Sequence, residues 1–254
     1  MRQEPASRVF LVVLAGGRST RASQGDSTAP KQFREVGGAP VFVHGLRELA
    51  QVPELVHAVV VVPDAWRPVA HDALAAADLP VAWTLATAGE HRTASTWSAL
   101  RALAALPAAA RPAPDDLVAV HDAARPFASR HLLMRVAEAA QRHAAAVPAV
   151  PVPDTVVQLL PGQDEDAAER PLAGYLERSL LAAVQTPQAA RWADLHAVHA
   201  WAAAGAVSFT DDGGLLAARG VPPVVVPGEP GNWKITTEDD WRRAAERLRR
   251  RSAV

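Results

Sequence analysis

Apolar residues along this 254-residue chain alternate between two periodicities, and this alternation is what most constrains the fold. Short runs rich in Val, Ala and Leu, typical of buried strands, occupy residues 9–14, 58–62, 81–85, 117–120 and 144–152. Segments with apolar residues three and four positions apart occupy residues 41–50, 65–77, 93–106 and 129–143. Apolar strands separated by amphipathic helices are typical of parallel sheets with right-handed crossovers. The sequence therefore predicts an α/β fold, with a doubly wound, Rossmann-like, mostly parallel sheet sandwiched by helices.

The alternation stops between residues 154 and 184. Two extended stretches, residues 155–160 and 172–176, flank a polar segment at residues 162–170. This part is too short for a core of its own, and a chain of this length commonly folds as one α/β unit. We therefore expect a single domain of residues 1–254 with a protruding β-arm.

The regular pattern resumes towards the C-terminus. Val224-Val225-Val226 predicts one more strand. A final amphipathic helix is expected to begin near Thr236 or Thr237, because each is followed three residues later by an Asp that can complete an N-terminal cap.

Composition excludes several function classes. The formal net charge is -1, with 26 basic and 27 acidic residues mixed along the chain, so nothing indicates binding to nucleic acid or to an anionic membrane. The chain has no cysteine, which excludes disulfides, a thiolate nucleophile and cysteine-ligated metal. No apolar run approaches the roughly 18 residues that span a bilayer. We expect a soluble, cytoplasmic protein in which any phosphate binding is local.

Lysine is rare in this chain. Only Lys31 and Lys234 are lysines among the 26 basic residues. A compact ammonium suits a point contact with phosphate, whereas arginine presents a wide planar fork. Both lysines lie in segments suited to phosphate binding. The alternative is that both lie on solvated loops by chance, and the rarity of lysine alone does not distinguish the two.

A glycine-containing loop follows the first predicted strand. Leu14-Ala15-Gly16-Gly17 leads to Arg21, and Pro30-Lys31-Gln32-Phe33 comes shortly afterwards. In α/β sheets, ligands bind beyond the C-terminal ends of the strands. Glycines let backbone N–H groups converge on an anion, and Arg21 and Lys31 supply charge, so the segment predicts a triphosphate site. It matches neither a Walker loop nor a dinucleotide fingerprint.

A carboxylate lies at the end of another predicted strand, in His121-Asp122-Ala123-Ala124-Arg125-Pro126-Phe127. Mg²⁺ needs only one or two carboxylates once phosphate oxygens and water complete its shell, so Asp122 is the expected magnesium ligand. The alternative is that Asp122 caps a helix, and His121 is interpreted as a packing residue. Thr210-Asp211-Asp212 and the segment around Lys234 could likewise be an N-cap and a strand edge.

Together these segments resemble the 2-C-methyl-D-erythritol 4-phosphate cytidylyltransferase family of the non-mevalonate isoprenoid pathway. The resemblance rests on residues 14–21, 30–33, 89–95, 120–127, 153–155, 185–188, 210–212 and 234–236. The family transfers CMP from CTP to the acceptor phosphate and releases pyrophosphate. The resemblance therefore implies a magnesium-dependent cytidylyltransferase that works as a homodimer.

The resemblance also implies roles for individual residues. Catalytic charge stabilisation would come from Arg21, Lys31 and Lys234, and Asp122 would hold magnesium. Nucleotide binding is implied for Ala15, Gly16, Gly17, Gly89, Glu90 and Ser95. Acceptor binding is implied for Arg125, Thr155, Arg178, Thr210 and Thr236. Thr155 and Arg178 would reach a neighbouring subunit from the arm.

Three other functions are compatible with part of the sequence. A ribitol 5-phosphate cytidylyltransferase shares the glycine loop and the Pro-Lys-Gln-Phe segment, but Asp122 to Pro126 and Glu177-Arg178-Ser179 favour methylerythritol phosphate. A sugar 1-phosphate nucleotidyltransferase would explain residues 14–21 alone. A nucleotide-sensing protein on the same fold would not need Arg21, Lys31, Asp122 and Lys234 together. Ser19, Ala22 and Gly213-Gly214 depart from the residues usual in the family.

Overall fold

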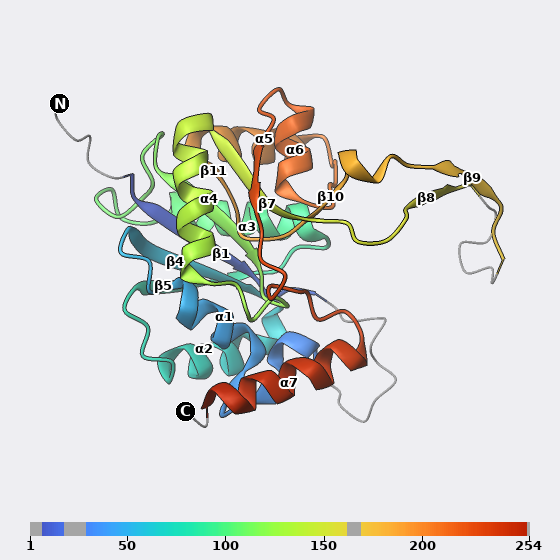
Figure 1. Ribbon diagram of the computed structural model, residues 1–254. Helices are drawn as coiled ribbons and strands as arrows, with labels where there is room; N and C mark the ends of the chain where they lie inside the picture. Colours follow the sequence, from blue (N-terminus) through green and yellow to red (C-terminus); the bar gives the residue numbers. More distant parts are fainter. Residues whose placement is uncertain (1–6, 18–28, 162–168, 253–254) are drawn as a thin grey trace.

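The computed structural model describes residues 7–17, 29–161 and 169–252, and it is built around one mixed sheet of eight strands (Figure 1). The strand order is β10-β7-β11-β6-β1-β4-β5, and β12 pairs with β7. The strands are β1 (Val9–Leu14), β4 (Leu55–Val62), β5 (Ala82–Thr87), β6 (Leu117–Asp122), β7 (Ala145–Pro151), β10 (Ala182–Val184), β11 (Gln188–Arg191) and β12 (Val224–Pro227). The strands β1, β4, β5 and β6 pair with one another in parallel, and β12 is parallel to β7. The predicted mostly parallel sheet is confirmed.

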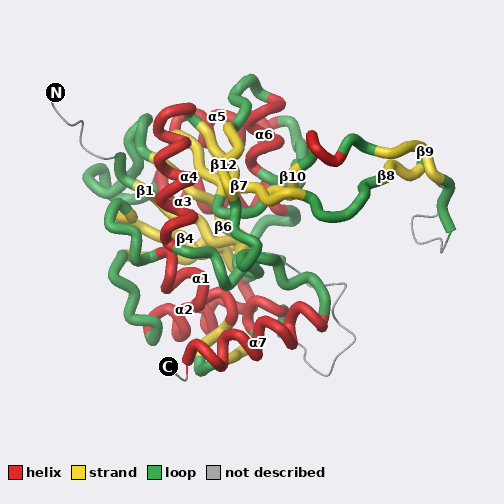
Figure 2. Tube along the Cα trace, viewed as in Figure 1, coloured by secondary structure: helices red, strands yellow, loops and turns green. Residues whose placement is uncertain are grey.

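Helices cover both faces of the sheet (Figure 2). They are α1 (Val41–Leu49), α2 (Arg67–Ala75), α3 (Arg92–Ala104), α4 (Arg130–His143), α5 (Trp192–Ala204) and α6 (Asp212–Ala218). A further helix, α7 (Glu238–Ser252), packs against Val36, Phe127 and Ile235 beside the sheet. None of these helices combines the length and the apolar character that crossing a bilayer requires.

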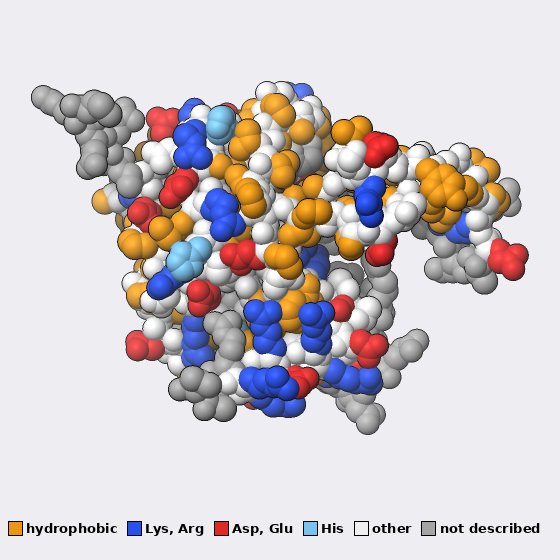
Figure 3. Space-filling view, in the orientation of Figure 1, with side chains coloured by type: hydrophobic (Ala, Val, Ile, Leu, Met, Phe, Trp, Pro, Cys, Tyr) orange, Lys and Arg blue, Asp and Glu red, His pale blue; other side chains and the backbone are white. Residues whose placement is uncertain are grey.

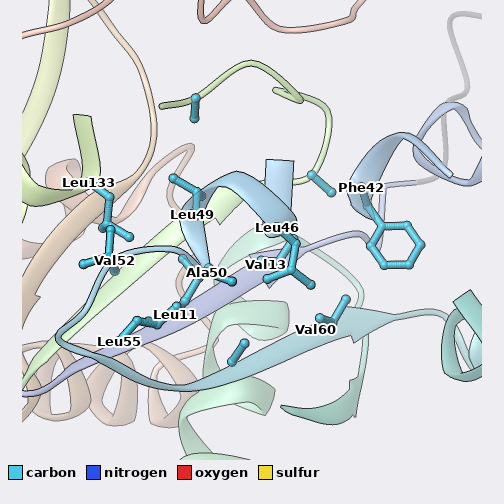
Figure 4. Close-up of a cluster of buried hydrophobic side chains, with 14 of the residues drawn as sticks. Leu11, Val13, Phe42, Leu46, Leu49, Ala50, Val52, Leu55, Val60 and Leu133 are labelled. Carbon is cyan, nitrogen blue, oxygen red and sulfur yellow. The ribbon is translucent and has the colours of Figure 1, made fainter. Parts of the chain in front are cut away.

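The alternating side chains of β1 explain why two helix layers form. Leu11 and Val13 face a cluster that includes Phe42 and Leu46 of α1 (Figure 4). Phe10 and Val12 face the opposite cluster, with Leu100 of α3 and Leu195 of α5. Successive side chains of a strand point to opposite faces, so an uninterrupted apolar strand must be covered twice. Burial of these side chains drives the sandwich, at about 25 cal/mol per Å² of apolar surface.

Two strands depart from the sequence-based expectation. β11 pairs antiparallel with both β6 and β7, and β10 pairs antiparallel with β7. Neither segment was predicted. The residues of β11, Gln-Ala-Ala-Arg, include no β-branched or aromatic residue, so they do not by themselves indicate a strand. The helix expected over residues 65–77 is also shorter: a 3₁₀ turn, Asp64–Trp66, precedes α2, whose first turn contains a proline.

The predicted arm is present. β8 (Val157–Leu159) and β9 (Leu172–Tyr175) form a separate antiparallel pair that projects from the body of the molecule (Figures 1 and 2). Of the predicted polar segment, residues 162–170, the part from 162 to 168 lies outside the described residues. Leu180, in the 3₁₀ turn Arg178–Leu180, is 83% exposed and Tyr175 is 72% exposed. Hydrophobic side chains are visible along the arm in Figure 3. The arm therefore presents apolar surface that this chain does not cover.

The last helix, α7, fixes the position of the segment that precedes it. Thr237 and Asp240 cap α7 reciprocally: the Thr237 N–H donates to Asp240 Oδ2 and the Asp240 N–H donates to Thr237 Oγ1. The helix was expected to begin near Thr236 or Thr237, and it begins at Glu238 with the cap formed by Thr237. Buried α7 residues, including Trp241 and Leu248, pack with Ile235 and Phe127. The packing fixes the stretch that carries Lys234.

Candidate active site

The candidate site lies where β1 and β6 end. The two strands pair in parallel with Leu14 opposite Asp122, so the glycine loop and the Asp122 carboxylate leave the sheet side by side. The chain runs from β1 outward to β4 and β5, then returns to β6 on the other side of β1. This change of direction is the topological switch point at which open α/β sheets bind ligands.

A pocket of about 420 Å³ opens at this point. Seven of the residues selected from the sequence line it: Gly16, Gly17, Gly89, Glu90, Ser95, Asp122 and Lys234. Leu14, Gln32, His91, Arg92 and Ala124 complete the wall. Segments separated by more than 200 residues therefore meet around one cavity.

Asp122 is the electrostatic centre of this pocket. Lys234 Nζ donates to Asp122 Oδ2 over 2.8 Å, and Arg92 Nε lies 3.5 Å from Asp122 Oδ1. Burial by itself would raise the pKa of Asp122, but Lys234 and Arg92 more than offset it and the pKa is lowered. The carboxylate is thus held ionised with one cation on each oxygen.

His121 has a structural role, as the sequence-based interpretation had it. Its Nε2 lies 3.0 Å from the Arg125 carbonyl and its Nδ1 lies 3.1 Å from Thr186 Oγ1. Burial lowers the pKa of His121 to about 4, so the ring is neutral at pH 7. The same Thr186 hydroxyl accepts from the Asp122 N–H, which ties the end of β6 to the segment before β11.

The remaining catalytic candidates lie beside the pocket or outside the described residues. Lys31 is buried, and its ammonium donates to the carbonyl of Thr236. Next to it, Gln32 Nε2 donates to the carbonyls of Ala15 and Gly17. Lys31 is therefore fastened between the glycine loop and the segment that carries Lys234. Arg21 lies outside the described residues, as do Ser19 and Ala22.

The five acceptor-binding candidates do not line this pocket. Arg125 donates to the carbonyl of Asn232 over 2.8 Å, and Thr236 Oγ1 donates to Asp240 Oδ2 over 2.7 Å. Thr210 is exposed just before α6, and Thr155 is exposed on the arm. Arg178 donates to the Pro153 carbonyl and borders a second hollow of about 820 Å³ at the base of the arm. Within one chain these residues are not gathered at one point.

Residues 185–188 and 210–212, two of the motifs that carry the family resemblance, fix other parts of the site. Gln188 Oε1 accepts from the N–H groups of Asp212 and Gly213 and thereby fixes the start of α6. Asp211 is the N-cap of α6, accepting from the Gly214 N–H over 2.9 Å. The capping alternative for this motif is correct for Asp211, whereas Asp212 points inward and forms an ion pair with Arg92 at 2.6 Å.

Sequence reasoning missed Arg92. The residue lies at the first turn of α3, inside the 89–95 motif, and contacts both Asp122 and Asp212. One signal was present, because this cation lies two residues after the pocket residue Glu90. With many arginines in the chain, its sequence neighbourhood alone did not set it apart.

Two of the three glycines that line the site, Gly16 and Gly89, are required by close packing. A Cβ on Gly16 would lie 2.6 Å from the Ala88 Cβ, and one on Gly89 would lie 2.5 Å from the Ala94 Cβ and 2.8 Å from the Ala94 carbonyl carbon. Gly17, by contrast, has open space around it. The Gly89 N–H donates to the Ser95 hydroxyl, so this turn closes tightly onto α3.

Comparison with known proteins agrees with this geometry. A sequence model described as 2-C-methyl-D-erythritol 4-phosphate cytidylyltransferase, IspD, matches residues 9–250. The chain belongs to this family. A curated IspD relative from Symbiobacterium thermophilum, named 2-C-methyl-D-erythritol 4-phosphate cytidylyltransferase, is 37% identical, over 93% of this chain and 91% of its own length.

Solved IspD-family structures share the fold. The 2-C-methyl-D-erythritol 4-phosphate cytidylyltransferase from Thermus thermophilus superposes with a TM-score of 0.70 at 32% identity, over 95% of this chain and 99% of that one. The Anaerococcus prevotii 4-diphosphocytidyl-2C-methyl-D-erythritol synthase superposes with a TM-score of 0.76 at 26% identity, over 96% of both chains.

Other IspD relatives are longer: a bifunctional IspD/IspF enzyme of Anaeromyxobacter dehalogenans is 40% identical, and the match covers 93% of this chain but 56% of that one. The chain thus spans little more than half the length of such bifunctional relatives.

The contact at Gly89 yields a test of the pocket. Replacing Gly89 with Ala forces the turn away from α3, because the new methyl group meets backbone as well as side-chain atoms of Ala94. We expect the G89A variant to bind CTP at least about tenfold more weakly, a loss of roughly 1.4 kcal/mol. Gly174→Ala, where the added carbon has open space on the arm, is the matched control. Calorimetric titration with CTP that gave equal affinity for G89A and wild type would remove this turn from the nucleotide site.

Proposed function

We propose that this chain transfers CMP from CTP to 2-C-methyl-D-erythritol 4-phosphate and releases pyrophosphate. A phosphate oxygen of the acceptor attacks the α-phosphorus of CTP, and the bond from that phosphorus to the oxygen bridging to the β-phosphate breaks. The observation that carries the proposal is the ionised Asp122 between Lys234 and Arg92, at the mouth of a glycine-lined pocket. Family membership supports the same chemistry.

The pocket suggests how the nucleotide is bound. The Gly89–Ser95 turn, with Glu90, offers backbone and side-chain groups to the cytosine, while Gly16 and Gly17 offer N–H groups to the phosphates. Ala15 is buried behind them, and its carbonyl is fixed by Gln32. A Cβ on Gly16 would lie only 3.6 Å from the Ser95 hydroxyl, so the two loops are neighbours, and the base and the triphosphate would occupy adjoining parts of one cavity.

Catalysis would come from positioned positive charge. Nucleotidyl transfer needs no side-chain nucleophile, and in related phosphoryl-transfer systems one cation aimed at the transition state can contribute roughly 10³ to 10⁵ in rate. Lys31 and Lys234 approach the pocket from two segments that are joined by the contact between Lys31 and Thr236. Arg21 would add a third cation from the glycine loop.

The residues present fit a magnesium ion. Asp122 is ionised and lines the pocket, and no cluster of three or more His, Cys, Asp or Glu side chains suited to a metal occurs among the described residues. A single carboxylate is the donor set expected where phosphate oxygens and water supply the other ligands. When bound, magnesium would neutralise charge on the triphosphate and on the pyrophosphate that leaves. Lys234 and Arg92 would then be freed from Asp122 to contact phosphate.

The arm supports a homodimer with shared sites. Thr155 and Arg178 lie on the arm or at its base, away from the pocket of their own chain, and the arm exposes Leu172, Tyr175 and Leu180. Covering such apolar side chains with a second copy is favourable. In the dimer, Arg178 and Thr155 of one subunit would join Arg125, Thr210 and Thr236 of the other around the acceptor. We also propose that the enzyme is soluble and cytoplasmic.

A direct assay separates the acceptors. We expect magnesium-dependent pyrophosphate release from CTP with 2-C-methyl-D-erythritol 4-phosphate and none with ribitol 5-phosphate, because the family model and the named relatives point to the former. Measuring pyrophosphate with each acceptor in separate reactions tests this. Turnover with ribitol 5-phosphate alone would overturn the acceptor assignment, and silence with both would overturn the proposed activity.

Subunit sharing can be tested by complementation. We expect Lys31→Ala to lower kcat at least a hundredfold, and Arg178→Ala to weaken acceptor binding while leaving CTP affinity nearly unchanged. At an acceptor concentration too low for Arg178→Ala to turn over, mixing the two variants should restore activity, because a hybrid dimer has one site with both residues intact. Mass spectrometry of the mixture verifies that subunits exchange. Proven exchange without any rescue would contradict sharing.

A further inference from the structure

Behind the pocket, a row of paired polar side chains runs into the interior. Asp122 at the pocket contacts Arg92, and Arg92 Nη1 lies 2.6 Å from Asp212 Oδ2. On the far side, His199 Nε2 lies 2.9 Å from Asp212 Oδ1. The side chains of His199 and Asp212 are 0% and 2% exposed. The row therefore begins at the pocket wall and ends inside the protein, at a histidine of α5.

The protonation of His199 follows from its partner. Arg92 and His199 more than offset the effect of burial and lower the pKa of Asp212, so its carboxylate is ionised and can only accept hydrogen bonds. His199 Nε2 must then carry a hydrogen and donate it. The other ring nitrogen, Nδ1, has no hydrogen-bond partner among the described residues. A ring with one buried nitrogen unused is a poor choice for packing alone, since burying an unpaired polar atom is costly.

Every group of Asp212 is fixed by a different element. Gln188 of β11 accepts from its N–H, His199 of α5 holds Oδ1, and Arg92 of α3 holds Oδ2. Without His199, the carboxylate could rotate about the remaining contacts. Arg92 would then lose the fixed partner that sets the direction of its guanidinium at the pocket.

We propose that His199 is a positioning residue, which holds the Asp212 carboxylate in the orientation that aims Arg92 into the nucleotide pocket. The inference rests on the proposed function, because it takes the pocket to bind the triphosphate of CTP. His199 is fully buried and does not line the pocket, so it acts through two other side chains. Outer partners of this kind commonly contribute about 10-fold to 100-fold to affinity or activity.

The test compares three substitutions on α5. His199→Leu removes the donor, and we expect it to raise KM for CTP by about tenfold, with a smaller change in kcat. His199→Gln places an amide N–H near the position of Nε2 and should restore most of the loss. His196→Leu, one turn earlier and packed between Trp97 and Trp192, is the matched control and should leave KM unchanged. All assays are run well below the melting temperature of each variant.

A double-mutant cycle tests whether the change in KM caused by His199→Leu depends on Arg92. We expect Arg92→Lys and His199→Leu to be non-additive, with the second substitution adding little once the first is made. Full additivity would overturn the proposal, as would an unchanged KM in His199→Leu or a glutamine variant as impaired as the leucine variant. Loss of activity in His196→Leu equal to that in His199→Leu would assign the effect to helix packing instead.

Calorimetric binding of magnesium-CTP to the same proteins separates the two proposals. Wild type that binds CTP but turns over no acceptor would contradict the proposed function and still allow His199 to be tested by affinity. Wild type that turns over normally, with His199→Leu equal to it in CTP affinity, would contradict the positioning role alone.

Discussion

Asp122 carries a negative charge at the end of β6, with its side chain only 14% exposed, and a charge in that position must be compensated by the protein. Removing an ion from water costs several kcal/mol even after the surroundings relax. The fold provides Lys234 on one carboxylate oxygen and Arg92 on the other. Arg92 comes from α3, the helix that precedes β6, and Lys234 from a segment 112 residues after Asp122, so the arrangement of much of the molecule can be understood as holding those two cations in place.

Each cation has its own support. Lys234 lies between Trp233 and Ile235, which pack against α7, and Arg247 of α7 lies over the Trp233 ring. Arg92 is supported by the buried pair of Asp212 and His199, and the start of α6 is fixed by Gln188. Helix α7 thus supports Lys234, and the buried Asp212–His199 pair supports Arg92. Both cations in turn contact the Asp122 carboxylate. Pairs of this kind are sensitive to the loss of either partner, because an uncompensated buried charge remains.

The balance of charge also prepares the site for a polyanion. In the structure the cations neutralise Asp122, and a triphosphate with its divalent ion would offer each of them a new partner. Positive charge that is already oriented needs little reorganisation when the reaction begins. Under the proposed function, a chain with a formal net charge of -1 would bind a strongly anionic substrate because positive charge is concentrated at the pocket.

How much of this could be predicted from sequence depended on the range of the interactions. β1 and β6 could be predicted because their residues are apolar on both faces, and Asp122 because it follows such a strand. β11 could not, since its place depends on pairing with β6 and β7 rather than on its own residues. Arg92 and His199 were missed for the same reason: their partner Asp212 lies in another element, and nothing in the local sequence indicates a buried ion pair.

The central claim is that Asp122 is an ionised ligand for the divalent ion, and binding of Mn²⁺ in the presence of CTP tests it most directly. Electron paramagnetic resonance titration would compare wild type with Asp122→Asn, using Asp115→Asn at an exposed position as the control. The account predicts that Asp122→Asn, still folded by circular dichroism, binds Mn²⁺ with CTP at least about tenfold more weakly, while Asp115→Asn matches wild type. Equal Mn²⁺ affinity in all three proteins would contradict it.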